Sequence, residues 1–226
     1  MKKLSDINEG VFRNSIVRTS GTGAKRRESD IDYIPVDLGL PSGTLWCDRN
    51  VGATSPEDYG GYFQWGATED MTGKSCAPAT CPYRDAKMDM FEKYNDIDKK
   101  AVLEPEDDAA HVSMGGGWHI PTFEQCNELM ENTDRRPASV GGVEGMIFES
   151  RKNGNSIFIP YAGYMSSSNL HTTGEKFFVW SSSIHLGPTL AYKFSYYLSS
   201  GRKSYSNIVF DTDRYYGLSI RGVMDK

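Results

Sequence analysis

The sequence predicts an α+β fold with an antiparallel sheet, one main helix and long surface loops. Residues 145–223 contain closely spaced strand-like segments separated by polar turns, which is typical of an antiparallel meander. Residues 122–130 carry the clearest helical pattern of the chain. The composition also favours strands and irregular loops, because 23 of 226 residues are Gly and 13 are Tyr.

The first element expected in the folded body is a β-hairpin. A short strand at 36–38 leads into the turn-forming sequence Leu-Pro-Ser-Gly at 40–43, and residues 44–47 are expected to return as the second strand. Trp46 lies in that second strand and is large enough to anchor a core. The hairpin therefore marks the beginning of the body near residue 35.

The region between this hairpin and the main helix is expected to be mostly loop. An aromatic segment bracketed by glycines, at 59–66, is predicted to be a strand. The composition of 67–110 is that of a loop, with a short helix around 85–94.

The main helix is predicted from both its start signal and its apolar face. Pro121 precedes it, Thr122 can cap it, and Gln125 follows three residues later, as a capping box requires. Its apolar residues recur at helical spacing on one face: Phe123, Cys126, Leu129 and Met130.

The last third of the chain is expected to form the strands of the meander. The predicted strands are 145–150, 156–160, 177–181, 191–198, 206–211 and 216–223. Polar turns separate them, as at 153–155 and 199–203.

The first 34 residues differ chemically from the body. They hold seven Lys and Arg against five Asp and Glu, a balance of +2, whereas the remaining 18 against 25 give −7. The segment is too polar to bury a core of its own. Because it still carries apolar side chains, we expect an arm that attaches to a partner and not a loose tail. The residues predicted to make that attachment are Ile7, Val11, Phe12, Ile16, Arg26 and Arg27.

Charge and hydropathy exclude several classes of function. A net charge of −5 argues against a general nucleic-acid binder, since phosphate recognition needs a concentrated basic surface. No apolar stretch of 18 residues occurs, so no membrane insertion is expected. The first residues lack the apolar core of a secretory signal, so export by the ordinary secretory route is not expected.

Seven segments of the body resemble the Fibrobacter succinogenes major paralogous domain, in the order of that family. They cover roughly residues 34–224, and Gly222 departs from the proline usual in the family. The resembling segments are 37–46, 50–53, 60–66, 116–122, 153–160, 180–182 and 216–221. Residues 4–28 also resemble the leader segments of phage structural proteins.

This resemblance implies a fold similar to C-type lectin-like domains and to the formylglycine-generating sulfatase-modifying family. Domains of this type occur in surface proteins of gut Bacteroidales and in their phages. The sulfatase-modifying activity needs cysteines late in the domain, and no cysteine follows Cys126. The Glu-Pro-Asn and Trp-Asn-Asp motifs of calcium-dependent lectins are also absent, so neither activity is carried over and no enzyme is expected.

Two groups of residues carry side chains that can bind a metal ion. An acidic run supplies enough oxygen ligands for Ca²⁺, but it lacks the spacing of an EF-hand, and a solvated acidic loop is the favoured interpretation. Cys76 and Cys81 bracket a short loop without a second ligand pair, so two ordinary thiols are favoured over zinc or a disulfide. No cofactor is therefore expected. The calcium candidates are Asp96, Asp98, Glu104 and Asp107, with Glu106 and Asp108 in the same run.

The segment 160–171 is the predicted ligand-binding loop. It is rich in Tyr, Ser and Asn, which combine rigid contact area with adaptable hydrogen bonds. The predicted ligand-binding residues are Tyr161, Tyr164, Asn169 and His171. The alternative is that the two tyrosines pack over the meander.

Together these features predict a non-enzymatic virion protein of a Bacteroidales phage, of the head-fibre, decoration or tail-adhesin type. Residues 1–34 would attach it to capsid or tail proteins, and residues 35–226 would present a lectin-like domain to a host-surface glycan or protein. We expect a homo-oligomer, assembled in the host cytoplasm into the virion. The alternative is an adhesin module on a bacterial cell surface.

Overall fold

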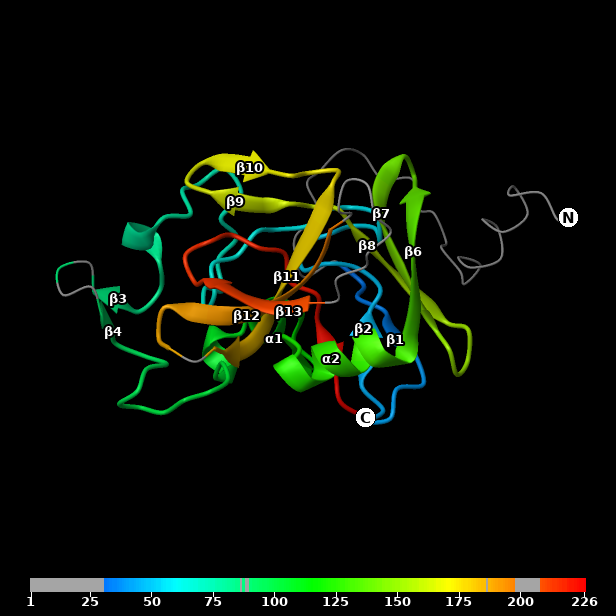
Figure 1. The fold of residues 1–226 in the computed structure, drawn as a ribbon, viewed down its shortest axis with the longest axis horizontal. Helices are drawn as coiled ribbons and strands as arrows, with labels where there is room; N and C mark the ends of the chain where they lie inside the picture. The colour runs from blue at the N-terminus through cyan, green and yellow to red at the C-terminus, as the bar shows by residue number, and fades with distance from the viewer. Residues whose placement is uncertain (1–30, 86, 88–89, 186, 198–207) are drawn as a thin grey trace, which may run out of the picture.

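The computed structural model describes residues 31–85, 87, 90–185, 187–197 and 208–226. In this part of the chain, small antiparallel sheets dominate and two α-helices accompany them (Figure 1). The predicted β-rich α+β class is therefore confirmed. The six residues predicted to attach the arm to a partner lie outside the described residues. No helix among the described residues is long and apolar enough to cross a membrane.

The predicted opening hairpin is confirmed, and it belongs to a sheet that joins distant parts of the chain. The amide of Gly43 donates to the carbonyl of Leu40 at 3.0 Å and closes the turn. Antiparallel pairing runs in the order β1-β2-β14-β5, so a strand near the end of the sequence lies between two earlier ones. The four strands are β1 Pro35–Asp37, β2 Leu45–Cys47, β5 Trp118–His119 and β14 Val223–Met224.

The main helix, α2 Phe123–Asn132, is confirmed together with its cap. The Thr122 hydroxyl accepts from the amide of Gln125 at 3.3 Å, and the Gln125 side chain accepts from the amide of Thr122 at 2.9 Å. A second helix, α1 Ala109–Met114, was not predicted. It is short, and it begins where the Asp108 carboxylate accepts from the amide of His111.

The predicted meander is divided into two three-stranded sheets and a separate hairpin. The first sheet has the order β6-β7-β8 and the second β11-β12-β13, and β9 pairs with β10. Strand β8 has the predicted bounds, whereas β6 and the β9–β10 hairpin were not predicted. The strands are β6 Thr133–Val140, β7 Val143–Ser150, β8 Ser156–Pro160, β9 Tyr164–Ser166, β10 Asn169–His171, β11 Lys176–Ile184, β12 Leu190–Tyr197 and β13 Ile208–Asp213.

Three predicted elements were wrong. The segment 59–66 is irregular and makes one isolated bridge, between Phe63 and Leu218. Its aromatic side chains are buried, so packing positions the segment although no neighbouring strand pairs with it. The helix predicted at 85–94 is replaced by an antiparallel pair, β3 Arg84–Asp85 with β4 Met90–Phe91. The segment 216–222 makes single bridges to several neighbours and becomes a strand only at β14. Two short 3₁₀ turns, η3 Pro78–Thr80 and η4 Pro105–Asp107, complete the loop region.

The core is aromatic, as its composition predicts. Trp46 contacts the ring of Phe194 edge-on in one cluster beneath α2, and Trp65 and Trp180 belong to a neighbouring cluster. The core also encloses two arginines that have no carboxylate partner within ion-pair distance among the described residues. One of them is Arg214, which follows β13. Its guanidinium lies 4.0 Å from the centre of the Phe91 ring and so connects β4 to the segment after β13.

Candidate functional site

The predicted ligand-binding loop folds as the β9–β10 hairpin. In the view of Figure 1 this hairpin lies along the top of the body, and α1 and α2 lie along the bottom. His171 pairs with Tyr164 and Asn169 pairs with Ser166. All three residues of β10 are exposed, and Leu170 is 51% exposed. The hairpin thus presents an edge strand whose side chains reach solvent.

The four predicted binding residues do not share one environment. Tyr161 is only 7% exposed and stacks on Phe177 in the core, so its prediction as a surface contact was wrong. Tyr161 instead packs in the core, as the alternative interpretation of the sequence predicts. The other three residues, Tyr164, Asn169 and His171, lie together on the hairpin.

Tyr164 is half-buried and lies beneath the exposed His171 side chain. Its half-buried ring stacks on the imidazole of His171 with centres 5.0 Å apart and planes 23° apart. Phe178 and Tyr216 contact the same ring edge-on at 5.4 and 5.5 Å. These contacts fix the imidazole on an aromatic base, while His171 itself remains exposed.

The backbone of the hairpin is tightly constrained. Gly163 has φ +66°, and a Cβ there would lie 2.1 Å from the carbonyl oxygen of His171. Ser167, before β10, and Thr172, after it, both have positive φ, which is rare for residues with a side chain and above all for a β-branched one. Such conformations persist only where surrounding contacts enforce them, and they occur often at functional sites.

The loop from 74 to 81 is bonded to the turn of this hairpin, between β9 and β10. Cys76 and Ser167 exchange two backbone hydrogen bonds of 2.8 and 2.7 Å. Cys76 and Cys81 are both buried thiols, and burial raises the pKa of each to about 11. Thiols of this kind are structural and poorly nucleophilic at neutral pH.

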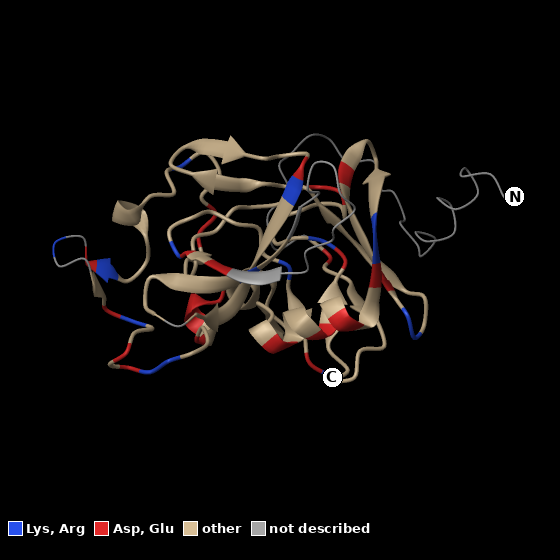
Figure 2. Cartoon of the chain, in the orientation of Figure 1, with Lys and Arg blue, Asp and Glu red and all other residues tan. Residues whose placement is uncertain are grey.

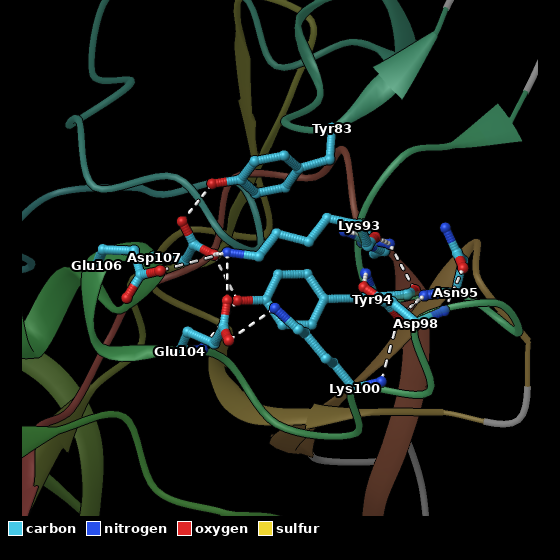
Figure 3. Close-up of polar contacts among 10 residues, drawn as sticks. Tyr83, Lys93, Tyr94, Asn95, Asp98, Lys100, Glu104, Glu106 and Asp107 are labelled. Carbon is cyan, nitrogen blue, oxygen red and sulfur yellow. Dashed lines mark hydrogen bonds and ion pairs between the residues drawn. The ribbon is translucent and has the colours of Figure 1, made fainter.

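The acidic run predicted as a calcium candidate surrounds a lysine (Figure 3). The Lys93 ammonium lies 2.6 Å from Glu104 Oε2 and 3.7 Å from Glu106 Oε1, and it also contacts Asp107. The hydroxyl groups of Tyr83 and Tyr94 donate to the same Asp107 carboxylate. The lysine thus occupies the position at which a bound cation would neutralise these carboxylates.

The remaining calcium candidates lie outside this cluster. Asp98 accepts from the amides of Tyr94 and Asn95 at 2.7 and 2.9 Å and so shapes the turn between them. Asp96 is exposed. In Figure 2, blue and red segments both occur along the loop that carries this run. Lys99 and Lys100 follow Asp98, whereas the part from Glu104 to Asp108 contains no basic residue.

Hydrogen bonding decides the ionisation of Asp107. Burial alone would raise its pKa, but the hydrogen bonds from Lys93 and the two tyrosines outweigh burial and hold the pKa below its usual value. The Asp107→Asn variant should therefore be less stable at pH 7 by about 2 kcal/mol, since hydrogen bonds to charged groups contribute about 1.5–3 kcal/mol. Urea unfolding at several pH values measures this difference.

The pH dependence follows from the lowered pKa of Asp107. A folded-state pKa below the unfolded value makes the stabilisation complete above about pH 3.9 and removes it as the pH falls through the folded-state pKa. The gap between wild type and Asp107→Asn should thus narrow at pH 3. A gap that stays constant between pH 7 and pH 3 would contradict this account. The exposed Glu69, paired with Lys74, supplies the control variant Glu69→Gln, which should change little.

The sequence did not point to two residues of these sites, Leu170 of the hairpin and Lys93 of the acidic cluster. Leu170 lies between two predicted binding residues and is exposed like them, although strand alternation turns its side chain to the opposite face. Lys93 had no local signal, because Glu104, Glu106 and Asp107 meet it only after the chain has turned.

Comparison of the chain with protein-family models, with curated proteins and with solved structures found no match. The function must therefore be inferred from the residues of the chain itself.

Proposed function

We propose that this chain is a non-enzymatic virion protein of a Bacteroidales phage that displays a lectin-like body. The β9–β10 hairpin contacts a glycan or protein on the host surface, and residues 1–34 attach the chain to capsid or tail proteins. The observation that carries the binding role is an exposed β10 strand on a rigid aromatic base.

This hairpin suits recognition for two physical reasons. Its backbone and its imidazole are already fixed, so a ligand orders few additional groups on binding. On one face of β10, Asn169 and His171 offer an amide that donates and accepts and an aromatic ring, and Leu170 offers an apolar group on the other face. Many copies on one particle would convert weak binding at each hairpin into strong attachment.

A glycan array and host-cell binding by the full chain test the hairpin. The His171→Ala variant removes the exposed ring, and we expect about tenfold weaker binding, because an aromatic contact contributes roughly 0.5–1.5 kcal/mol. His111 is also exposed but lies on α1, so His111→Ala is the matched control. Equal loss of binding in both variants, or no loss in His171→Ala, would count against the hairpin.

Analysis of purified particles tests the virion role separately. Mass spectrometry should find the chain as a stoichiometric component, and deletion of residues 1–34 should abolish its incorporation while the body still folds. Normal incorporation of the deleted chain would refute attachment through the arm. Recovery of the native protein from intact bacterial surfaces would instead support the adhesin alternative.

A further inference from the structure

Four aromatic side chains form a row that continues from the β9–β10 hairpin onto the segment after β13. The imidazole of His171 stacks on Tyr164 with ring centres 5.0 Å apart, and Tyr164 meets the ring of Tyr216 edge-on at 5.5 Å. Tyr216 contacts Tyr215 at 4.6 Å. Tyr164 covers one side of the imidazole, and because His171 is exposed, its other side reaches solvent. We call these four side chains the aromatic row.

The backbone beneath the aromatic row is fixed by hydrogen bonds. Met165 and Gly217 exchange two backbone hydrogen bonds of 2.8 and 3.0 Å, which hold the segment of Tyr216 beside β9. The carbonyl of Tyr215 accepts from the Gln64 side chain at 2.9 Å. The two central rings of the row also pack against a buried core cluster. The row is therefore ordered before a ligand arrives, and binding has few groups left to immobilise.

Polar groups accompany the aromatic row along its length. Strand pairing and alternation place Asn169 and Ser166 on the same face of the hairpin as the two hairpin members of the row. Asn169 and His171 are both exposed. At the other end, Tyr215 and Tyr216 are half-buried, and the hydroxyl of the first donates to that of the second at 3.5 Å. The face therefore combines aromatic surface with an amide and hydroxyl groups that donate and accept.

This face lacks the exposed apolar centre that a stable protein interface needs. Such interfaces bury about 800 Å² on each partner around an apolar core. The aromatic row contains no aliphatic side chain, and the neighbouring exposed Leu170 lies on the opposite face of β10. The other exposed large apolar side chains belong to other segments of the described chain: Ile34, Met90, Ile97, Val102 and Val112.

A chain of sugar rings matches the composition of this face. A sugar ring carries C–H groups that pack on an aromatic ring, and hydroxyl groups at its edge that donate and accept hydrogen bonds. Because the row contains several rings in succession, a ligand with consecutive sugar rings gains a contact at each of them. The row contains no carboxylate, lysine or arginine, so these contacts require neither a charged ligand nor a bound cation.

We propose that the aromatic row, together with Asn169, binds a neutral oligosaccharide along its length without a metal ion. One sugar ring stacks on the free side of His171, and the following rings pack on Tyr216 and Tyr215. The sugar hydroxyls bond to the Asn169 amide and to the tyrosine hydroxyls. This inference rests on the binding role proposed above for the hairpin, and it adds the class of ligand and two residues that lie outside the hairpin.

Binding of the full chain to an array of neutral monosaccharides and linear oligosaccharides tests the row. Oligosaccharides should bind more tightly than their monosaccharides. Tyr215→Ala should weaken binding about tenfold, and Tyr215→Phe, which keeps the ring, should restore most of it. Tyr192→Ala is the matched control, because Tyr192 is also half-buried and contacts two rings, Phe123 and His185, outside the row. Equal weakening by Tyr215→Ala and Tyr192→Ala, or equal binding of monosaccharides and oligosaccharides, would overturn the proposal.

Treated host cells give the second measurement and separate this inference from the proposed function. Periodate, which oxidises sugars, should abolish binding of the full chain, whereas proteinase treatment of the cells and addition of EDTA should leave it unchanged. Loss of binding after proteinase but not after periodate would identify a protein ligand, and loss in EDTA would identify a metal-dependent site. Either result would refute the neutral oligosaccharide, yet the hairpin would stand if His171→Ala still weakens binding. Failure of His171→Ala to weaken it would count against the hairpin itself.

Discussion

Replacing Arg221 with methionine is expected to destabilise the protein by about 3–5 kcal/mol, a large part of the 5–15 kcal/mol typical of a folded domain. Arg221 is fully buried, and each of its three nitrogens has an acceptor. Nε donates to Asn50 Oδ1 at 3.0 Å, Nη1 to the carbonyl of Cys47 at 3.0 Å, and Nη2 to the carbonyl of Phe158 at 2.9 Å.

The expected loss comes from these three acceptors, which join separate parts of the body. Each buried acceptor that loses its donor costs about 1–3 kcal/mol, and removal of a desolvated charge returns part of that sum. Burial lowers the pKa of Arg221 to about 10, so the guanidinium is still protonated at pH 7. Arg221→Lys should be nearly as destabilising, because one ammonium cannot reproduce the planar donor fork.

Urea unfolding measures the effect of these changes. Arg136, which is 51% exposed and 3.9 Å from Glu149, supplies the matched control. Arg136→Met should change stability by less than about 0.5 kcal/mol. An Arg221→Met protein as stable as this control would show that the three hydrogen bonds contribute nothing net.

Gly163→Ala is the second substitution with a large expected effect. Its added Cβ would lie 2.1 Å from the carbonyl oxygen of His171 and 2.8 Å from the amide of Thr173, both backbone atoms that cannot rotate away. The positive φ costs about 1–2 kcal/mol in alanine, and the overlap adds about 1–3 kcal/mol. We expect a total loss of about 3–5 kcal/mol and displacement of β10.

Gly174 separates these two contributions. It also has a positive φ, +79°, but a Cβ there would meet nothing within 4 Å. Gly174→Ala should therefore lose only about 1–2 kcal/mol and keep ligand binding. Thermal unfolding and the host-cell assay measure both properties. Equal losses in the two variants would mean that the close approach to His171 is unimportant.

The sequence predicted the elements whose determinants are local. The α2 helix is one, because Thr122 and Gln125 cap it within four residues, and the first hairpin is another, because its turn residues are consecutive. The elements that were missed or wrong depend on distant partners. The segment around Phe63 is held by single bridges and buried rings, which no periodic pattern reveals.

In the candidate site, too, features with local determinants were predicted and those that depend on distant contacts were not. The composition of 160–171 predicted a binding loop there, and three of its four predicted residues lie on one hairpin, while their binding role stays a prediction. Tyr161 was misassigned because tyrosine occurs both in cores and on surfaces, and only its contact with Phe177 decides between them. The pairing of Lys93 with three carboxylates could not be predicted, since no sequence spacing specifies it.

The position of β14 has a consequence for how the protein is made. This strand inserts between β2 and β5, so the first sheet is incomplete until residue 224 has left the ribosome. Arg221 also donates hydrogen bonds to Asn50 and to the carbonyl of Phe158, which are synthesised much earlier. Folding of this sheet is therefore expected to be slow and to begin only after β14 has been synthesised, because its pairing contacts span most of the sequence. Termination before Val223 would leave a chain in which β2 and β5 have lost the strand between them.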